Sequence, residues 1–111
     1  LFRSALTEKL SPHCTVALHT QGQEIYWRYG DYADPAAQAL GEQMADASGY
    51  SLTHPAPGSA NAGFKDWFIA RFARPGFTVE AGLGQNPLPL TQLPEIYHQV
   101  LPILCLAMTG G

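Results

Sequence analysis

The sequence has little charge. Only 14% of its 111 residues are Asp, Glu, Lys or Arg, its six basic residues are scattered, and its formal net charge is −3. Nucleic-acid binding requires clustered basic side chains that neutralise phosphates, so we do not expect a nucleic-acid partner. The hydrophobic content of 46% is typical of a globular protein. A thin charged surface predicts that another chain, or another part of the same protein, covers some of it.

Cysteines and long apolar runs are also scarce. The two cysteines, Cys14 and Cys105, lie in apolar runs without metal-type spacing, which predicts buried thiols. No apolar run reaches the ~18 residues of a membrane span. The length allows one domain at most. Residues 1–3 begin inside an amphipathic pattern without a starting Met, which predicts a piece of a longer chain.

Four helices are predicted from periodicity and end signals. Apolar residues at helical spacing indicate a helix over residues 2–10 and another over 93–108, the second with a kink or break at Pro102. Asp34-Pro35 is a typical helix start and Gly49 a typical helix end. Aromatic residues at i, i+3, i+4 and i+8 predict a short helix over 64–72. The bulky aromatic residues expected in the core are Trp27, Trp67, Phe68 and Phe72.

The strand signals are shorter. Residues 14–18 form a continuous apolar run with β-branched members, 24–27 read as extended, and 77–79 read as a buried strand. Residues 51–63 are rich in Pro, Gly and small polar residues, which predicts a loop. The order is helix, strand, strand, helix, loop, helix, strand, helix. This order predicts an α/β fold with a mixed sheet.

Two side chains that could bind a metal or transfer a proton follow predicted strands. His19 and Glu80 are placed at strand ends, where open α/β sheets bind their ligands. An imidazole and a carboxylate in one crevice could serve zinc chemistry, in which the metal activates water and the carboxylate takes the proton. The residues alone leave other interpretations open. His19 could be a structural, hydrogen-bonded residue, and Glu80 could cap a helix or pair with Arg71 or Arg74.

Four sequence blocks narrow these possibilities. They are His-Thr-Gln-Gly-Gln-Glu-Ile-Tyr-Trp (19–27), Gly-Phe-Lys-Asp-Trp-Phe (63–68), Phe-Thr-Val-Glu-Ala-Gly (77–82) and Asn-Pro-Leu-Pro-Leu (86–90). In this order they resemble segments of the carboxypeptidase A-like zinc peptidases, most closely the bacterial branch that cleaves γ-D-glutamyl-diaminopimelate bonds in cell-wall peptides. The resemblance spans residues 16–104. It implies the C-terminal portion of a zinc-carboxypeptidase-like α/β/α mixed-sheet fold, with residues 1–111 as one partial catalytic domain.

The resemblance also assigns roles to single residues. It makes His19 a zinc ligand and Glu80 the general base that activates water and then protonates the leaving amine. Lys65 matches a position that lines the substrate pocket, where a cation would favour the spare carboxylate of diaminopimelate. The opposing interpretation of Lys65 is a solvated lysine at a helix start.

The sequence departs from the family at the other zinc ligands. These come from an upstream His-x-x-Glu motif that is missing here. The residues three positions after His13, His54 and His98 are Val16, Pro57 and Leu101. A catalytic zinc site needs about three protein ligands. We therefore expect the chain to be inactive in isolation and to require a missing N-terminal half.

Three functions remain open at this stage. The first is a portion of a zinc metallopeptidase that acts on a peptide substrate. The second is a non-catalytic remnant that binds peptides or muropeptides. The third is a structural fragment that pairs with another copy of itself, because a half-sheet leaves an unprotected edge. The family branch implies a bacterial protein, either cytoplasmic or associated with the cell wall.

Overall fold

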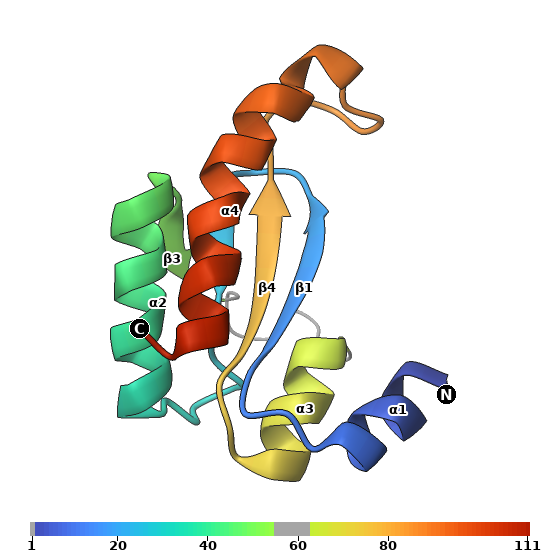
Figure 1. The fold of residues 1–111 in the computed structure, drawn as a ribbon, viewed down its shortest axis with the longest axis vertical. Coiled ribbons are helices and arrows are strands. Elements are labelled where there is room, and N and C mark those ends of the chain that lie inside the picture. Colours follow the sequence, from blue (N-terminus) through green and yellow to red (C-terminus); the bar gives the residue numbers. More distant parts are fainter. Residues whose placement is uncertain (1, 55–62) are drawn as a thin grey trace.

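The computed structural model describes residues 2–54 and 63–111, which form a mixed sheet with helices on both faces (Figure 1). In chain order the elements are α1 (Phe2–Leu10), β1 (Thr15–Thr20), β2 (Glu24–Tyr26), α2 (Pro35–Ser48), β3 (Ser51–Thr53), α3 (Phe64–Phe72), β4 (Gly76–Ala81), a 3-10 turn (Leu90–Gln92) and α4 (Leu93–Thr109). The predicted α/β class with a mixed sheet is confirmed. The likeness to a zinc-carboxypeptidase fold remains a prediction.

The four strands lie in the order β1-β4-β2-β3. β1 pairs with β4 in parallel and β2 pairs with β3 in parallel, whereas β2 and β4 are antiparallel. The last strand in sequence therefore lies inside the sheet, between two strands from the first quarter of the chain. β1 and β3 form the two edges.

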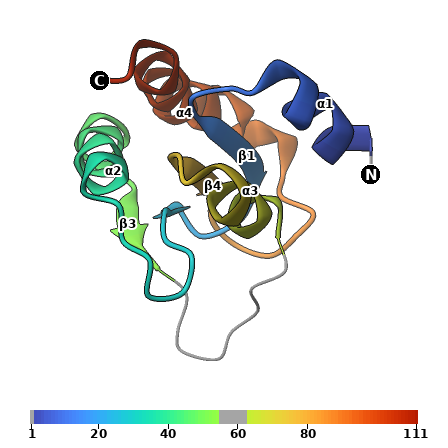
Figure 2. The ribbon, with the colours of Figure 1, turned by 90° about the horizontal axis from the view of Figure 1, so that it is seen from below.

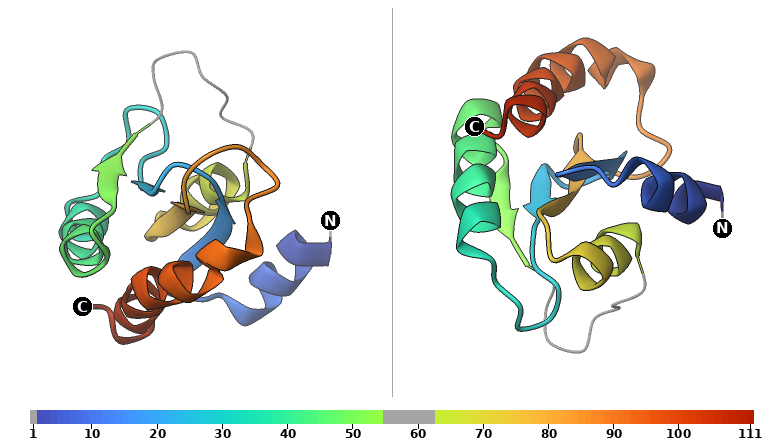
Figure 3. Two further views of the ribbon diagram at one scale, coloured as in Figure 1. Left: turned by 90° about the horizontal axis from the view of Figure 1, so that it is seen from above. Right: turned by 60° about the horizontal axis from the view of Figure 1, so that its bottom comes forward.

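Helices α2 and α4 cover one face of the sheet, as the end-on views show (Figures 2 and 3). Helix α2 begins as predicted, because the side chain of Asp34 accepts a hydrogen bond from the backbone amide of Ala36 at 3.0 Å. It ends at Gly49, which adopts a φ of 79°. The fully buried side chains of this core are Ile25, Met44, Phe77, Val79 and Ile103.

Helix α3 covers the opposite face near the start of β1 and β4. A Cβ atom on Gly76 would lie 3.1 Å from Phe68 and 3.3 Å from Ile69, so the helix packs directly on the strand backbone here. Phe68 is buried as predicted, and so is Trp27 on the β2 side. The other two aromatic residues predicted for the core, Trp67 and Phe72, are half-buried, and their rings pack edge to face with centroids 6.1 Å apart.

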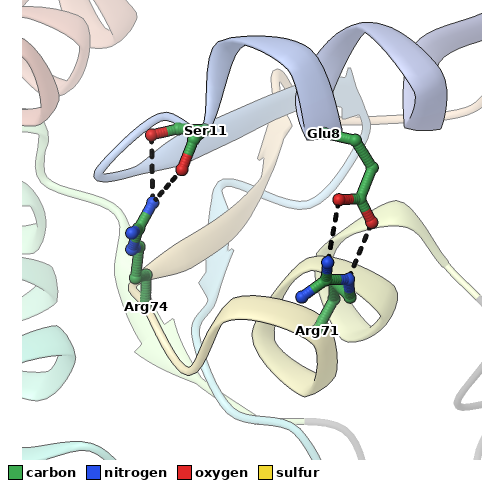
Figure 4. Close-up of polar contacts among 4 residues, drawn as sticks. All are labelled: Glu8, Ser11, Arg71 and Arg74. Atoms are coloured by element: carbon green, nitrogen blue, oxygen red, sulfur yellow. Dashed lines mark hydrogen bonds and ion pairs between the residues drawn. The ribbon is translucent and has the colours of Figure 1, made fainter.

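Helix α1 is anchored to the α3 region by polar contacts (Figure 4). Arg71 donates two hydrogen bonds to the carboxylate of Glu8, at 2.7 and 3.0 Å, and Arg74 donates to the carbonyl and hydroxyl of Ser11. The predicted apolar face of α1 is largely uncovered, since Phe2, Leu6 and Leu10 are exposed. This helix contributes little to the core of the described residues.

Three details differ from the sequence predictions. Residues 51–53, predicted as loop, form strand β3, because they pair with β2; residues 55–62 of that predicted loop lie outside the described residues. Pro102 does not divide α4, because Val100 and Ile103 on either side of it are both buried. The strands also run further than predicted, so His19 and Glu80 lie within β1 and β4.

The long C-terminal helix does not change the membrane prediction. In residues 2–54 and 63–111, none of the helices combines the length and apolar character that a bilayer crossing requires.

Candidate functional site

His19 and Glu80 are neighbours in the sheet. They are register partners in the parallel β1–β4 pair, and Glu80 is in turn the register partner of Glu24 in the antiparallel β2–β4 pair. Register partners project to the same face of a sheet. The three side chains therefore form one row across three strands, in the order His19, Glu80, Glu24.

This row lies on the face of the sheet that carries α3. Gly76 contacts α3, and Glu80 lies four residues further along the same strand. Side chains alternate between faces with a period of two, so Glu80 projects to the α3 face, while Val79 and Ala81 project into the core under α2 and α4. At this end of the strands His19 is exposed and Glu80 half-buried, so both are open to a ligand.

Glu24 and Tyr26 are site residues that the sequence did not reveal. Both project from β2 to the same face, and the hydroxyl of Tyr26 donates a hydrogen bond to Glu24 Oε2 at 2.8 Å. This bond, with burial and the negative charges of Glu24 and Glu80, raises the pKa of Tyr26 above its usual value. The phenol therefore keeps its proton at neutral pH and remains a donor. The spacing of the two residues indicates a shared face, but the pairing of β2 with β4 cannot be read from the sequence.

Backbone and side-chain bonds join the two loops that border the row. Thr20 Oγ1 donates to Asn86 Oδ1 at 2.6 Å, and Asn86 Nδ2 donates to the carbonyl of Thr20 at 3.1 Å. The amide of Gly22 donates to the carbonyl of Gly82 at 2.8 Å. The turn after His19 and the segment after Glu80, more than 60 residues apart in sequence, thus meet at one end of the sheet.

Lys65 lies elsewhere. It is buried, and its ammonium contacts the Asp66 carboxylate and the carbonyl of Arg28. Arg28 lies beyond the end of β2, which is Tyr26. The structure therefore brings His19 and Glu80 together in register, whereas the polar contacts of the Lys65 ammonium are with Asp66 and Arg28. The alternative of a solvated lysine is wrong, because Lys65 is buried.

The two cysteines are in different surroundings. Cys14 is half-buried, and burial raises the pKa of its thiol to about 11. Cys105 is exposed on α4, which corrects the prediction that both thiols are buried. The apolar run around Cys105 is helical, so one side of it faces solvent.

The donor set for a metal is small. Among residues 2–54 and 63–111, no group of three or more His, Cys, Asp and Glu side chains is placed to hold a metal ion. His19 can supply one imidazole nitrogen and Glu80 one carboxylate, whereas a catalytic zinc site uses about three protein ligands. The described residues therefore do not fit a complete zinc site. What they can provide is a proton-accepting carboxylate beside an imidazole on an open sheet end.

Comparison with known proteins finds relatives that are much longer than this chain. No protein-family model matches it. It is 44% identical over 88 residues to "Gamma-D-glutamyl-L-diamino acid endopeptidase 1" of Lysinibacillus sphaericus, a match that covers 79% of this chain and 22% of that protein. It is 40% identical over 97 residues to "Uncharacterized protein YqgT" of Bacillus subtilis (strain 168), covering 87% of this chain and 26% of that protein. The chain thus spans about a quarter of the length of these relatives.

Proposed function

We propose that this chain provides part of the active site of a zinc peptidase that hydrolyses γ-D-glutamyl-diamino acid bonds in cell-wall peptides. The observation that carries the proposal is the pairing of His19 with Glu80 in register on adjacent strands. The similarity to the L. sphaericus endopeptidase supports the substrate class.

Glu80 is proposed as the general base. Its carboxylate can take a proton from water and return it to the leaving amine, provided that substrate lies against the open face of the row. His19 is proposed as one ligand of a zinc ion. Because the described residues do not complete the donor set, we derive no catalytic step through the metal, and the remaining ligands would have to come from outside these residues.

Lys65 is proposed as a substrate contact for an acidic group. In the structure its ammonium already has a carboxylate partner in Asp66. A substrate carboxylate would have to replace or share that partner. The matching test is Lys65→Ala in a longer, active protein: it should reduce the preference for diaminopimelate peptides over lysine peptides, and an unchanged preference would remove Lys65 from the site.

A chimera tests the proposed function directly. In it, the 88 matched residues of the L. sphaericus endopeptidase are replaced by the corresponding residues of this chain. We expect zinc binding and hydrolysis of a γ-D-glutamyl-diaminopimelate peptide. Glu80→Gln should keep the zinc and lose at least ~100-fold in kcat, in line with the contribution of a general base. His19→Ala should lose the zinc.

Two controls make the result interpretable. His98→Ala removes an exposed imidazole on α4 and should change neither zinc content nor rate. The isolated chain should hold no tight zinc after dialysis, because one imidazole is too few ligands. A folded chimera in which His19→Ala keeps its zinc, or Glu80→Gln keeps its rate, would refute the assignment.

A second candidate is a peptide-binding role without catalysis. The absence of a three-ligand group among the described residues is what favours it. It predicts a chimera that binds the peptide, holds no zinc and does not cleave. Zinc content and turnover together separate the two candidates.

A further inference from the structure

Two carboxylates lie opposite each other on strands β2 and β4 without a basic partner. Glu24 and Glu80 are register partners in the antiparallel pair, and the Cβ atoms of such partners lie ~5 Å apart on one face of the sheet. The ion pairs within residues 2–54 and 63–111 join other side chains. Like charges placed directly opposite one another destabilise a sheet. A cation bound beside these carboxylates would remove the repulsion.

The side chain of Glu24 is oriented from its own strand. Tyr26, two residues further along β2 and on the same face, donates a hydrogen bond to Glu24 Oε2 at 2.8 Å. The same oxygen lies near the turn before β2, since a Cβ atom on Gly22 would be 3.3 Å from it. A carboxylate has about four acceptor positions, so Glu24 can accept further hydrogen bonds while Tyr26 holds it. Glu24 is half-buried, so a ligand can still reach it.

These acceptors suit a primary ammonium. Within residues 2–54 and 63–111, no three His, Cys, Asp and Glu side chains are gathered around one point for a metal ion. An ammonium is a compact charge with three hydrogen-bond donors, which a carboxylate and a neighbouring hydroxyl can accept. A diamino acid carries a second amino group, which is an ammonium at neutral pH. The substrate class proposed above therefore offers the cation that this position lacks.

We propose that Glu24, oriented by Tyr26, binds the side-chain ammonium of the diamino acid and so selects it over a neutral residue. This inference rests on the proposed function, because it takes Glu80 as the group beside the scissile bond. Neighbouring strands lie ~4.8 Å apart, and the carbon chain of a diamino acid such as lysine is long enough to cross that distance. With the leaving nitrogen at Glu80, the ammonium reaches Glu24 on the next strand. Glu24 contacts the substrate, whereas Tyr26 is a positioning residue.

Binding, measured apart from turnover, tests the inference. The protein is the chimera described above with Glu80→Gln, so that the probes are not cleaved. The probes are γ-D-glutamyl-L-lysine and γ-D-glutamyl-L-2-aminoheptanoate, in which a methyl group replaces the ammonium. Calorimetry should show that the lysine peptide binds at least ~tenfold more tightly, in line with a hydrogen bond between charged groups. Adding Glu24→Gln should abolish this preference and leave the affinity for the aminoheptanoate peptide unchanged.

Two further variants and the pair of probes make the result decisive. Tyr26→Phe should reduce the preference for the lysine peptide, and Glu95→Gln, the same change of charge at an exposed position on α4, should leave it intact. Circular dichroism confirms that each variant is folded.

The outcomes separate this inference from the proposed function. A chimera that retains Glu24 but binds both peptides equally, or binds neither, would overturn the role of Glu24. So would a Glu24→Gln variant that keeps the preference or weakens both peptides alike. Failure of the proposed function looks different: the chimera with Glu80 intact would prefer the lysine peptide, yet hold no zinc and cleave nothing.

Discussion

Replacing Gly82 with Ala should cost more stability than its backbone conformation alone requires. Gly82 follows β4 with a φ of +76°, a region that costs a residue with a Cβ atom about 1–2 kcal/mol. A Cβ at this position would lie 2.4 Å from Leu88 Cδ1 and 3.0 Å from both Gln92 Oε1 and Ile96 Cδ1. Overpacking of this kind adds about 1–3 kcal/mol. We expect a total loss of about 2–5 kcal/mol.

The neighbours of Gly82 cannot all move without further loss. Gln92 is held by two hydrogen bonds to the backbone of Leu83, one accepted at 3.1 Å and one donated at 2.8 Å. Ile96 packs against the core from the first turn of α4. Only Leu88 is on a surface segment, so it is the side chain that can yield.

Gly49 provides the matched control. Its φ of +79° is nearly the same, but a Cβ there would meet nothing within 4 Å. Gly49→Ala should therefore lose only the conformational part, about 1–2 kcal/mol. Urea unfolding followed by tryptophan fluorescence measures both losses. Equal losses for the two variants would refute the crowding argument. Leu88→Ala in the Gly82→Ala background should recover stability, because it removes the nearest contact.

The remaining predictions concern buried charge and ionisation. Lys65→Met should destabilise the fold by about 3–5 kcal/mol in urea unfolding, because Asp66 is left as an unpaired buried carboxylate; adding Asp66→Leu should recover part of the loss, and no recovery would contradict the pairing. Iodoacetamide at pH 8 should alkylate Cys105 before Cys14, since burial raises the pKa of Cys14 to about 11; equal rates by mass spectrometry would contradict this order. The free energy of unfolding should fall between pH 9 and 11, because the unfolded chain releases the protons of Cys14 and Tyr26 at lower pH than the folded chain; Tyr26→Phe should reduce this slope.

Local signals in the sequence predicted the helices well. Asp34 and Gly49 have the cap geometries expected of them, so both ends of α2 were correct. Helix-capping signals act within a few residues, so they do not depend on how the rest of the chain folds. Pro102 shows where local signals fail. Proline was expected to kink or break the helix, but the packing of the long helix α4 against the sheet outweighed this local effect.

Pairing between distant strands was the part that sequence could not supply. β3 has only three residues and becomes a strand because β2 lies beside it. Nothing within residues 51–53 indicates that they pair with β2. Glu24 was missed for the same reason: it joins the site through the register of β2 against β4. His19 and Glu80 were expected in one crevice because both were placed at strand ends, and the family resemblance then gave them roles in one site; their register on adjacent strands was not predicted.

The bonds between Thr20 and Asn86, and between Gly22 and Gly82, have a mechanical consequence. They fasten the two loops to each other at two points, one through side chains and one through the backbone. A force applied to either loop therefore acts on both. The covalent chain and these hydrogen bonds together hold the strand ends that carry His19 and Glu80 at their separation. Displacing one loop therefore requires either breaking these bonds or moving the other loop with it.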